Sequence, residues 1–131
     1  MLYEHETQIR VRYSETDAMG RLHHAHFLNY LEVGRTEQLR SLGQSYREFE
    51  ETGLLLVVTK IAVNYRQAAN YDDLLRIHTR TVRVTSVRID HEYEILRDHE
   101  LLATGTSTLA CVDREGHIQR LPDWLRIEPG T

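Results

Sequence analysis

The segment TDAMGRLHHAHF, residues 16–27, stands between two different hydrophobic patterns and decides how the chain folds. Before it, residues 6–13 (ETQIRVRY) alternate apolar and polar side chains, which is the period of a strand. After it, residues 26–42 have a helical period, and Gly43 is a common helix stop. The expected apolar helix face consists of Leu28, Leu31, Leu39 and Leu42. We therefore expect a turn-rich loop at residues 14–25 that leads into a long helix.

Arg35 lies in the middle of this leucine face. Its stem could cover apolar surface while the guanidinium reaches water, or the charge could be paired with a carboxylate. Both interpretations make Arg35 a structural residue.

The second half of the chain consists of strand-like segments and short turns. A short helix is expected from Ser45, whose spacing to Glu48 fits a capping box. Strand patterns then follow at residues 54–65, 74–84, 89–96 and 101–112, with a last short strand or helix at 117–126. Strands joined by tight turns are antiparallel neighbours.

One long helix can cover that many strands only if the sheet curls around it. The expected fold class is therefore α+β, an antiparallel sheet of five or more strands wrapped around a long central helix. No repeat, linker or low-complexity tract interrupts the pattern, so residues 1–131 are expected to form a single domain.

Composition excludes several classes of protein. The formal charge is −4, from 16 basic and 20 acidic residues, which argues against a nucleic-acid groove. The single cysteine, Cys111, excludes an intrachain disulfide and a CxxC site. The longest apolar run, residues 54–58, is too short to span a bilayer, and the charged start MLYEHETQIRV is unlike a signal peptide. A cytoplasmic protein without membrane insertion is expected.

The acid, glycine and histidines that precede the helix are the main chemical signal. No phosphate-binding loop, dinucleotide fingerprint, HExxH or GxSxG motif occurs in the sequence. One interpretation is that the helix N-terminus polarises a carbonyl group while Asp17 attacks it or activates water. A second is that His24 and His26 bind a metal together with His23 or Asp17. A third is a solvated helix cap with incidental histidines.

The metal interpretation makes a further demand on the sequence. A cupin barrel pairs an HxH motif with a glutamate at short spacing and with a second block that contains Pro, Gly and His. Glu32 lies six residues beyond His26, and no second block is visible. The HxH motif alone is a weak signal.

Several motifs together resemble one family. These are residues 12–24, 27–32, 35–43, 63–65, 71–74 and 111–113. They look like the hotdog-fold acyl-CoA thioesterases, and in particular the 4-hydroxybenzoyl-CoA thioesterase and YbgC branch, over about residues 6–122. The resemblance implies the same sheet wrapped on a helix. It also implies dimers that join their sheets edge to edge, which commonly pair into tetramers.

The resemblance also implies roles for individual residues. Asp17 matches the catalytic carboxylate, and His24 matches the position whose backbone N–H faces the thioester oxygen. The remaining substrate-binding positions are Gly20, Phe27, Val58 and Thr59, the last two on the partner subunit's strand near the acyl group. Arg83 and Arg88 match the region that meets the coenzyme A phosphates.

The chain departs from the branch at a few positions. Residues 68–70 (AAN) stand where the branch usually has a Pro and a basic residue, and a Lys common near Thr85 is missing. These departures predict that the nucleotide part of coenzyme A is bound more weakly or by other residues. His26 and Phe27 replace a small polar residue and a Tyr, which bears on the acyl preference.

The expected function is hydrolysis of an acyl-CoA thioester to a free acid and coenzyme A, without metal or cofactor, by a homodimer or homotetramer. Asp17 could act as nucleophile or as general base, and both roles stay open at this point. The main alternative is a non-catalytic protein of the same fold that binds acyl thioesters or assembles with other proteins. Such a protein would be expected to lack the carboxylate at position 17, which is present here.

Overall fold

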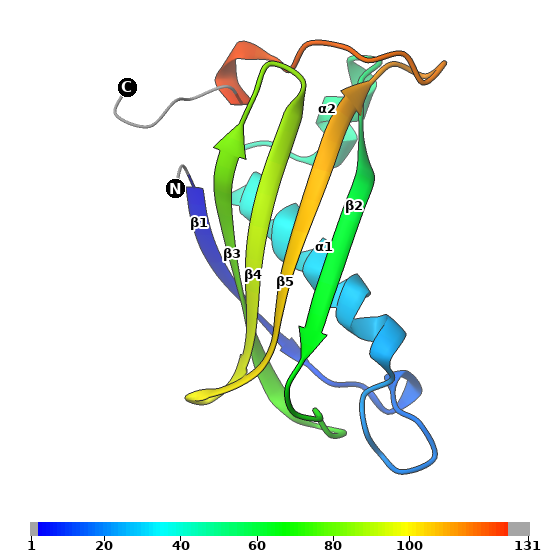
Figure 1. Cartoon of the computed structure of the whole chain (residues 1–131), viewed down its shortest axis with the longest axis vertical. Coiled ribbons are helices and arrows are strands. Elements are labelled where there is room, and N and C mark those ends of the chain that lie inside the picture. Colours follow the sequence, from blue (N-terminus) through cyan, green and yellow to red (C-terminus); the bar gives the residue numbers. More distant parts are fainter. Residues whose placement is uncertain (1–2, 126–131) are drawn as a thin grey trace.

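The computed structural model describes residues 3–125 (Figure 1). Seven main elements follow one another along the chain: β1 Tyr3–Arg10, α1 His24–Ser41, α2 Tyr46–Glu51, β2 Leu55–Tyr65, β3 Leu74–Val84, β4 Arg88–Arg97 and β5 Glu100–Val112. Two 3₁₀ turns, Tyr13–Glu15 and Asp123–Leu125, complete the set. None of the helices in this part of the chain is long and apolar enough to cross a membrane.

The five strands form one antiparallel sheet in the order β1-β3-β4-β5-β2, and α1 lies across one face of it (Figure 1). Strands β3, β4 and β5 are joined by short turns, whereas β1 and β2 form the two edges. The apolar side chains that alternate along β3 and β4 are buried on the side of the helix, Leu75, Ile77, Tyr93 and Ile95 among them. The α+β class and the wrapped sheet are confirmed.

The buried face of α1 differs from the predicted leucine face. It consists of Phe27, Tyr30, Leu31, Gly34, Gln38 and Leu39. Leu28 and Leu42 are 38% and 40% exposed, so the prediction was wrong for these two residues. Leu31 and Leu39 are buried as predicted, but a pattern based on leucines could not mark the glycine, the glutamine and the two aromatic residues that share this face.

Gly34 is where α1 comes closest to the sheet. A Cβ at this position would lie 2.5 Å from Thr79 Oγ1 and 2.9 Å from Ile77 Cγ2, both on β3. A larger side chain would therefore push the helix away from the sheet. Gly34 fixes the depth of α1, and with it the position of both helix ends.

Some predicted boundaries were also wrong. The first strand ends at Arg10 rather than at residue 13, because the chain turns into the 3₁₀ segment Tyr13–Glu15. The helix begins at His24 rather than at His26. The span of β3 and the Ser45 cap of α2, whose Oγ accepts from the Glu48 N–H at 3.1 Å, are confirmed. The last predicted element, a short strand or helix at residues 117–126, contains the 3₁₀ turn Asp123–Leu125; residue 126 lies outside the described residues.

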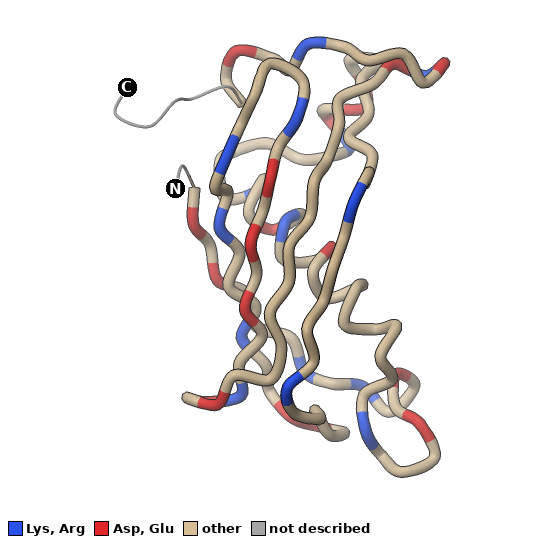
Figure 2. Tube along the Cα trace, viewed as in Figure 1, with Lys and Arg blue, Asp and Glu red and all other residues tan. Residues whose placement is uncertain are grey.

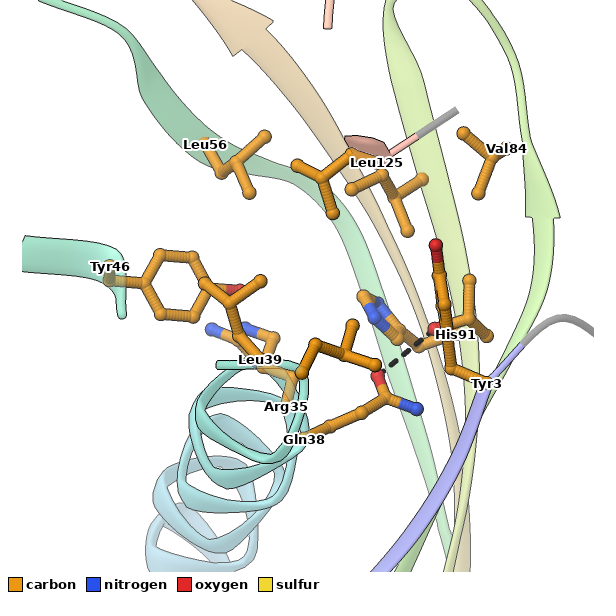
Figure 3. A pocket seen from close by; sticks show the side chains of 12 residues that line it. Tyr3, Arg35, Gln38, Leu39, Tyr46, Leu56, Val84, His91 and Leu125 are labelled. Atoms are coloured by element: carbon orange, nitrogen blue, oxygen red, sulfur yellow. Dashed lines mark hydrogen bonds between the residues drawn. The ribbon is translucent and has the colours of Figure 1, made fainter. Parts of the chain in front are cut away.

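Arg35 forms no ion pair with any residue in the described range 3–125. It lines a small cavity between α1, α2 and β4, together with Gln38, Tyr46 and His91 (Figure 3). The cavity has a volume of about 20 Å³, enough for roughly one water molecule. This volume is too small for an acyl chain.

Candidate active site

The Asp17 carboxylate is held by the backbone of its own turn. Asp17 N–H donates to the Arg21 carbonyl at 2.8 Å, and the Gly20 N–H donates to the Asp17 carbonyl at 3.1 Å. Asp17 Oδ1 accepts from the Met19 N–H at 2.8 Å and from the Arg21 N–H at 3.2 Å. Gly20 has a φ of +75°, which favours glycine. The turn thus orients one carboxylate oxygen and leaves Oδ2 without a partner among the described residues.

These hydrogen bonds also set the charge of Asp17. The Met19 N–H, followed by the Arg21 N–H, lowers the pKa of the carboxyl group below its ordinary value. The side chain is exposed, so it is ionised at neutral pH. An ionised carboxylate can act as a nucleophile or a general base but not as a general acid.

The N-terminus of α1 presents an unpaired N–H beside this turn. His23 is the N-cap, and its Nδ1 accepts from the Ala25 N–H at 3.2 Å. The His26 N–H donates to the His23 carbonyl at 2.9 Å. No acceptor within residues 3–125 pairs with the His24 N–H, which lies at the positive end of the helix dipole. This N–H can receive a carbonyl oxygen or an anion.

The three histidines have different hydrogen-bond or ring partners, although the His23 and His26 rings also lie 6.3 Å apart. His23 caps the helix, His26 Nδ1 pairs with Asn29 Nδ2 at 3.1 Å, and the His24 ring lies 4.6 Å from the Tyr65 ring. Within the described residues, three potential metal ligands converge only at Asp113, Glu115 and His117, in an exposed turn. The loop before α1 therefore does not gather the ligand set that the metal interpretation requires.

A pocket of about 330 Å³ joins the two features. Asp17, His24 and Phe27 line it, together with Tyr65 from the end of β2. The Tyr65 hydroxyl donates to the His24 carbonyl at 3.2 Å, and its ring lies 5.1 Å from the Phe27 ring. The pocket therefore has a carboxylate and a helix N-terminus on one side and an aromatic wall on the other.

A second groove, of about 550 Å³, lies between β1 and α1. Although it is larger, Asp17 and His24 do not line it, and its Glu15 carboxylate already accepts hydrogen bonds from Arg12 and Tyr30. The smaller pocket is the better candidate because it holds the free carboxylate oxygen and the free N–H.

The structure gathers some of the predicted site residues and separates others. Asp17, His24 and Phe27 line one pocket, and Gly20 shapes the Asp17 turn. Val58 and Thr59 are exposed in the middle of the edge strand β2, outside this pocket. The expectation that these two residues of one subunit lie near the acyl group bound at the other subunit's site stays a prediction.

Arg83 and Arg88 lie near the β3–β4 turn, at the end of the sheet far from the loop that precedes α1 (Figure 1). They do not line the Asp17 pocket of the same chain. Their predicted role toward coenzyme A phosphates also stays a prediction.

Among the pocket residues that sequence reasoning did not single out are Tyr65, Arg21 and Arg66. Tyr65 belongs to a quoted motif, but its 41-residue separation from His24 gave no sign of contact. The two arginines are exposed, and neither lies within ion-pair distance of a described carboxylate. Among the other described arginines, Arg83 and Arg88 likewise have no such partner, whereas seven are paired with a carboxylate: Arg10, Arg12, Arg40, Arg47, Arg76, Arg80 and Arg97.

Comparisons with known proteins agree on one family. The model of the thioesterase-like superfamily matches residues 11–127. YneP of Bacillus subtilis (strain 168) is 36% identical over 123 residues, which cover 89% of this chain and 89% of the relative. The acyl-CoA thioesterase YbgC of Haemophilus influenzae is 39% identical over 106 residues, 80% of this chain and 78% of the relative.

A solved structure extends the likeness to three dimensions. The DHNA-CoA thioesterase from Staphylococcus aureus has a TM-score of 0.88 and 31% identity, and the match covers 93% of this chain and 86% of that one. The chain therefore resembles thioesterases in sequence and in fold over most of its length.

The left-handed backbone at Gly20 predicts how the Asp17 pKa responds to substitution. Gly20→Val introduces backbone strain of about 1–2 kcal/mol, and it should weaken the hydrogen bonds to Asp17 Oδ1. We expect the Asp17 pKa, measured by NMR titration of its carboxyl carbon, to lie below 3.8 in the natural chain and to rise toward it in Gly20→Val. Gly20→Asn is the control, because asparagine tolerates this conformation. Equal Asp17 pKa values in all three proteins would contradict this account of the turn.

Proposed function

We propose, on the premise that this chain belongs to the thioesterase-like superfamily and is a thioester hydrolase, that it cleaves acyl-CoA in the pocket of Asp17 and His24. One observation carries the proposal. Two residues line the same pocket: Asp17, whose ionised carboxylate has one oxygen without a partner, and His24, whose backbone N–H at the helix start is unpaired among the described residues. A thioester needs both, since its carbonyl carbon must be attacked while its oxygen gains negative charge.

The reaction follows from this arrangement. The thioester oxygen accepts a hydrogen bond from the His24 N–H, and the dipole of α1 stabilises the charge that develops there. Asp17 either removes a proton from an attacking water or attacks the carbonyl carbon itself, forming an anhydride that water then opens. In both routes the C–S bond breaks, the sulfur leaves as coenzyme A thiol, and the acyl group leaves as a carboxylic acid.

The groups around this pocket suggest which part of the substrate lies where. Phe27 is buried and Tyr65 is half-exposed, so together they offer an apolar surface for the acyl group. Arg21 and Arg66 stand on the same pocket with free guanidinium groups, which suit the phosphates of coenzyme A. This placement differs from the expectation that Arg83 and Arg88 of the same chain hold the phosphates.

A second copy of the chain is the proposed partner, paired through β2. This edge strand carries Lys60 as its only charged residue (Figure 2), and Val57 and Val58 are 38% and 42% exposed. The other edge, β1, carries charged residues on its exposed side. Charged side chains discourage edge pairing, whereas an apolar edge favours it. A β2–β2 contact would place Val58 and Thr59 in the interface.

Removing the charge of Asp17 should remove most of the activity. Asp17→Asn keeps the shape and one acceptor oxygen, so we expect normal folding and at least a ~10²-fold fall in kcat for coenzyme A release. Asp98→Asn, in the exposed β4–β5 turn, is the matched control and should leave kcat unchanged.

His24→Ala should lower kcat less than Asp17→Asn does, because the backbone N–H of residue 24 remains. A chelator should leave the rate of coenzyme A release unchanged. If a chelator abolished the activity and zinc restored it, or if Asp17→Asn were fully active, the mechanism would be refuted.

The two arginines of the pocket should act on the phosphates and not on the thioester. We expect the double variant Arg21→Ala/Arg66→Ala to raise KM for acyl-CoA by about tenfold, the combined effect of two exposed ion pairs of up to about 1 kcal/mol each. KM for the same acyl group on N-acetylcysteamine, which has no phosphate, should not change. The pair Arg83→Ala/Arg88→Ala is the control. If only that pair raises KM for acyl-CoA, the phosphates lie at the β3–β4 turn instead.

A charge in the middle of β2 should break the proposed pairing. We expect Val58→Lys to be a monomer by light scattering and to lose activity if the partner strand completes the site. Gln8→Lys adds the same charge to the exposed side of β1 and should leave the oligomer intact. A natural chain that is monomeric at micromolar concentration and fully active would rule out this arrangement.

A further inference from the structure

A second carboxylate, Glu15, lies two residues before Asp17 and has the opposite environment. Its side chain is 5% exposed. Its Oε1 accepts from the Tyr30 hydroxyl at 2.7 Å and from the Arg12 N–H at 2.9 Å, and its Oε2 accepts from the Arg12 guanidinium at 3.0 Å. Both oxygens of Glu15 are therefore engaged, whereas Asp17 keeps one oxygen without a partner among the described residues.

The Glu15 backbone ties the same residue to the helix start. Its carbonyl accepts from the His23 N–H at 3.0 Å, immediately before His24. Next to it, Thr16 and Leu22 form an antiparallel bridge that closes the Asp17 turn. Glu15 is thus bonded to the turn that carries the catalytic carboxylate, to the N-cap of α1, and through Tyr30 to the second turn of α1.

The charge of this network is fixed. Burial raises the pKa of the Glu15 carboxyl, but the hydrogen bonds from Arg12 and Tyr30 outweigh it, and the net pKa lies below its ordinary value. Burial, followed by the bond to Glu15, raises the pKa of the Tyr30 hydroxyl, which therefore stays protonated as the donor. Charged hydrogen bonds in a buried site are short and strongly directional.

We infer that Glu15 and Tyr30 form a clamp that sets the distance between the Asp17 carboxylate and the His24 N–H, and that both are positioning residues of the hydrolase. Glu15 and Tyr30 do not line the Asp17 pocket, although both line the groove between β1 and α1, so the clamp would act on the reaction through Asp17 and the helix start. This inference rests on the proposed function of the same pocket. Since a misplacement of about 1 Å can cost up to ~10²-fold in rate, loosening the clamp should slow the chemical step.

Tyr30→Phe is the direct test, because it removes one hydroxyl and keeps the buried ring. We expect kcat for acyl-CoA hydrolysis to fall about tenfold while KM stays within about twofold. Tyr93→Phe is the matched control: Tyr93 is also buried, and its hydroxyl pairs with Ser107 at 2.5 Å, in a hydrogen bond with no link to the Asp17 turn. Both variants should lose similar thermal stability, but only Tyr30→Phe should lose kcat. Glu15→Gln should resemble Tyr30→Phe, since the neutral amide cannot accept from Arg12 at both of its terminal atoms.

The Asp17→Asn background separates positioning from general structure. If the clamp acts through the carboxylate, adding Tyr30→Phe to Asp17→Asn should lower the residual single-turnover rate by less than about twofold. A tenfold fall in both backgrounds, or an equal loss of kcat in Tyr93→Phe, would overturn the clamp. Full activity of Asp17→Asn alone would overturn the proposed function and the clamp together, whereas an inactive Asp17→Asn with a fully active Tyr30→Phe overturns the clamp only.

Discussion

The contact between α1 and the sheet at Gly34 is the constraint on which the rest of the site depends. A helix that approaches this closely has one depth and one rotation, since any Cβ would overlap β3. With the helix so fixed, Tyr30 one turn earlier points toward Glu15, and Phe27 another turn earlier points into the pocket. The free N–H at His24 then lies beside the Asp17 turn. A glycine with no chemical function therefore sets the position of the helix start at the proposed site.

Two carboxylates in one short loop have different proposed roles because their surroundings differ. Glu15 is buried, and hydrogen bonds occupy both of its oxygens, so it can only hold other groups in place. Asp17 is exposed, and the backbone bonds to one oxygen while the other stays open. Both are ionised at neutral pH, so the difference in role comes from geometry and access rather than from charge.

The strands and the loop were predictable from the sequence, whereas the helix face was not. Alternation and turn residues located β3 and β4, because each has one face on the core and one toward water. The rotation of α1 depends on Gly34 and Gln38, which no hydrophobic pattern can mark as buried. The position of Asp17 was identifiable from its spacing to the helix. Tyr65 and Arg66 join the pocket only through the fold, which brings the end of β2 against the helix start, whereas Arg21 belongs to the Asp17 turn itself.

The central claim is that Asp17 and the N-terminus of α1 act on the same thioester. A crystal structure of Asp17→Asn with an unhydrolysed acyl-CoA bound tests this most directly. The account predicts the thioester oxygen within about 2.7–3.1 Å of the His24 nitrogen, with the substituted side chain at position 17 facing the carbonyl carbon and the acyl group against Phe27 and Tyr65. A thioester bound away from the start of α1, for example in the groove between β1 and α1, would contradict it.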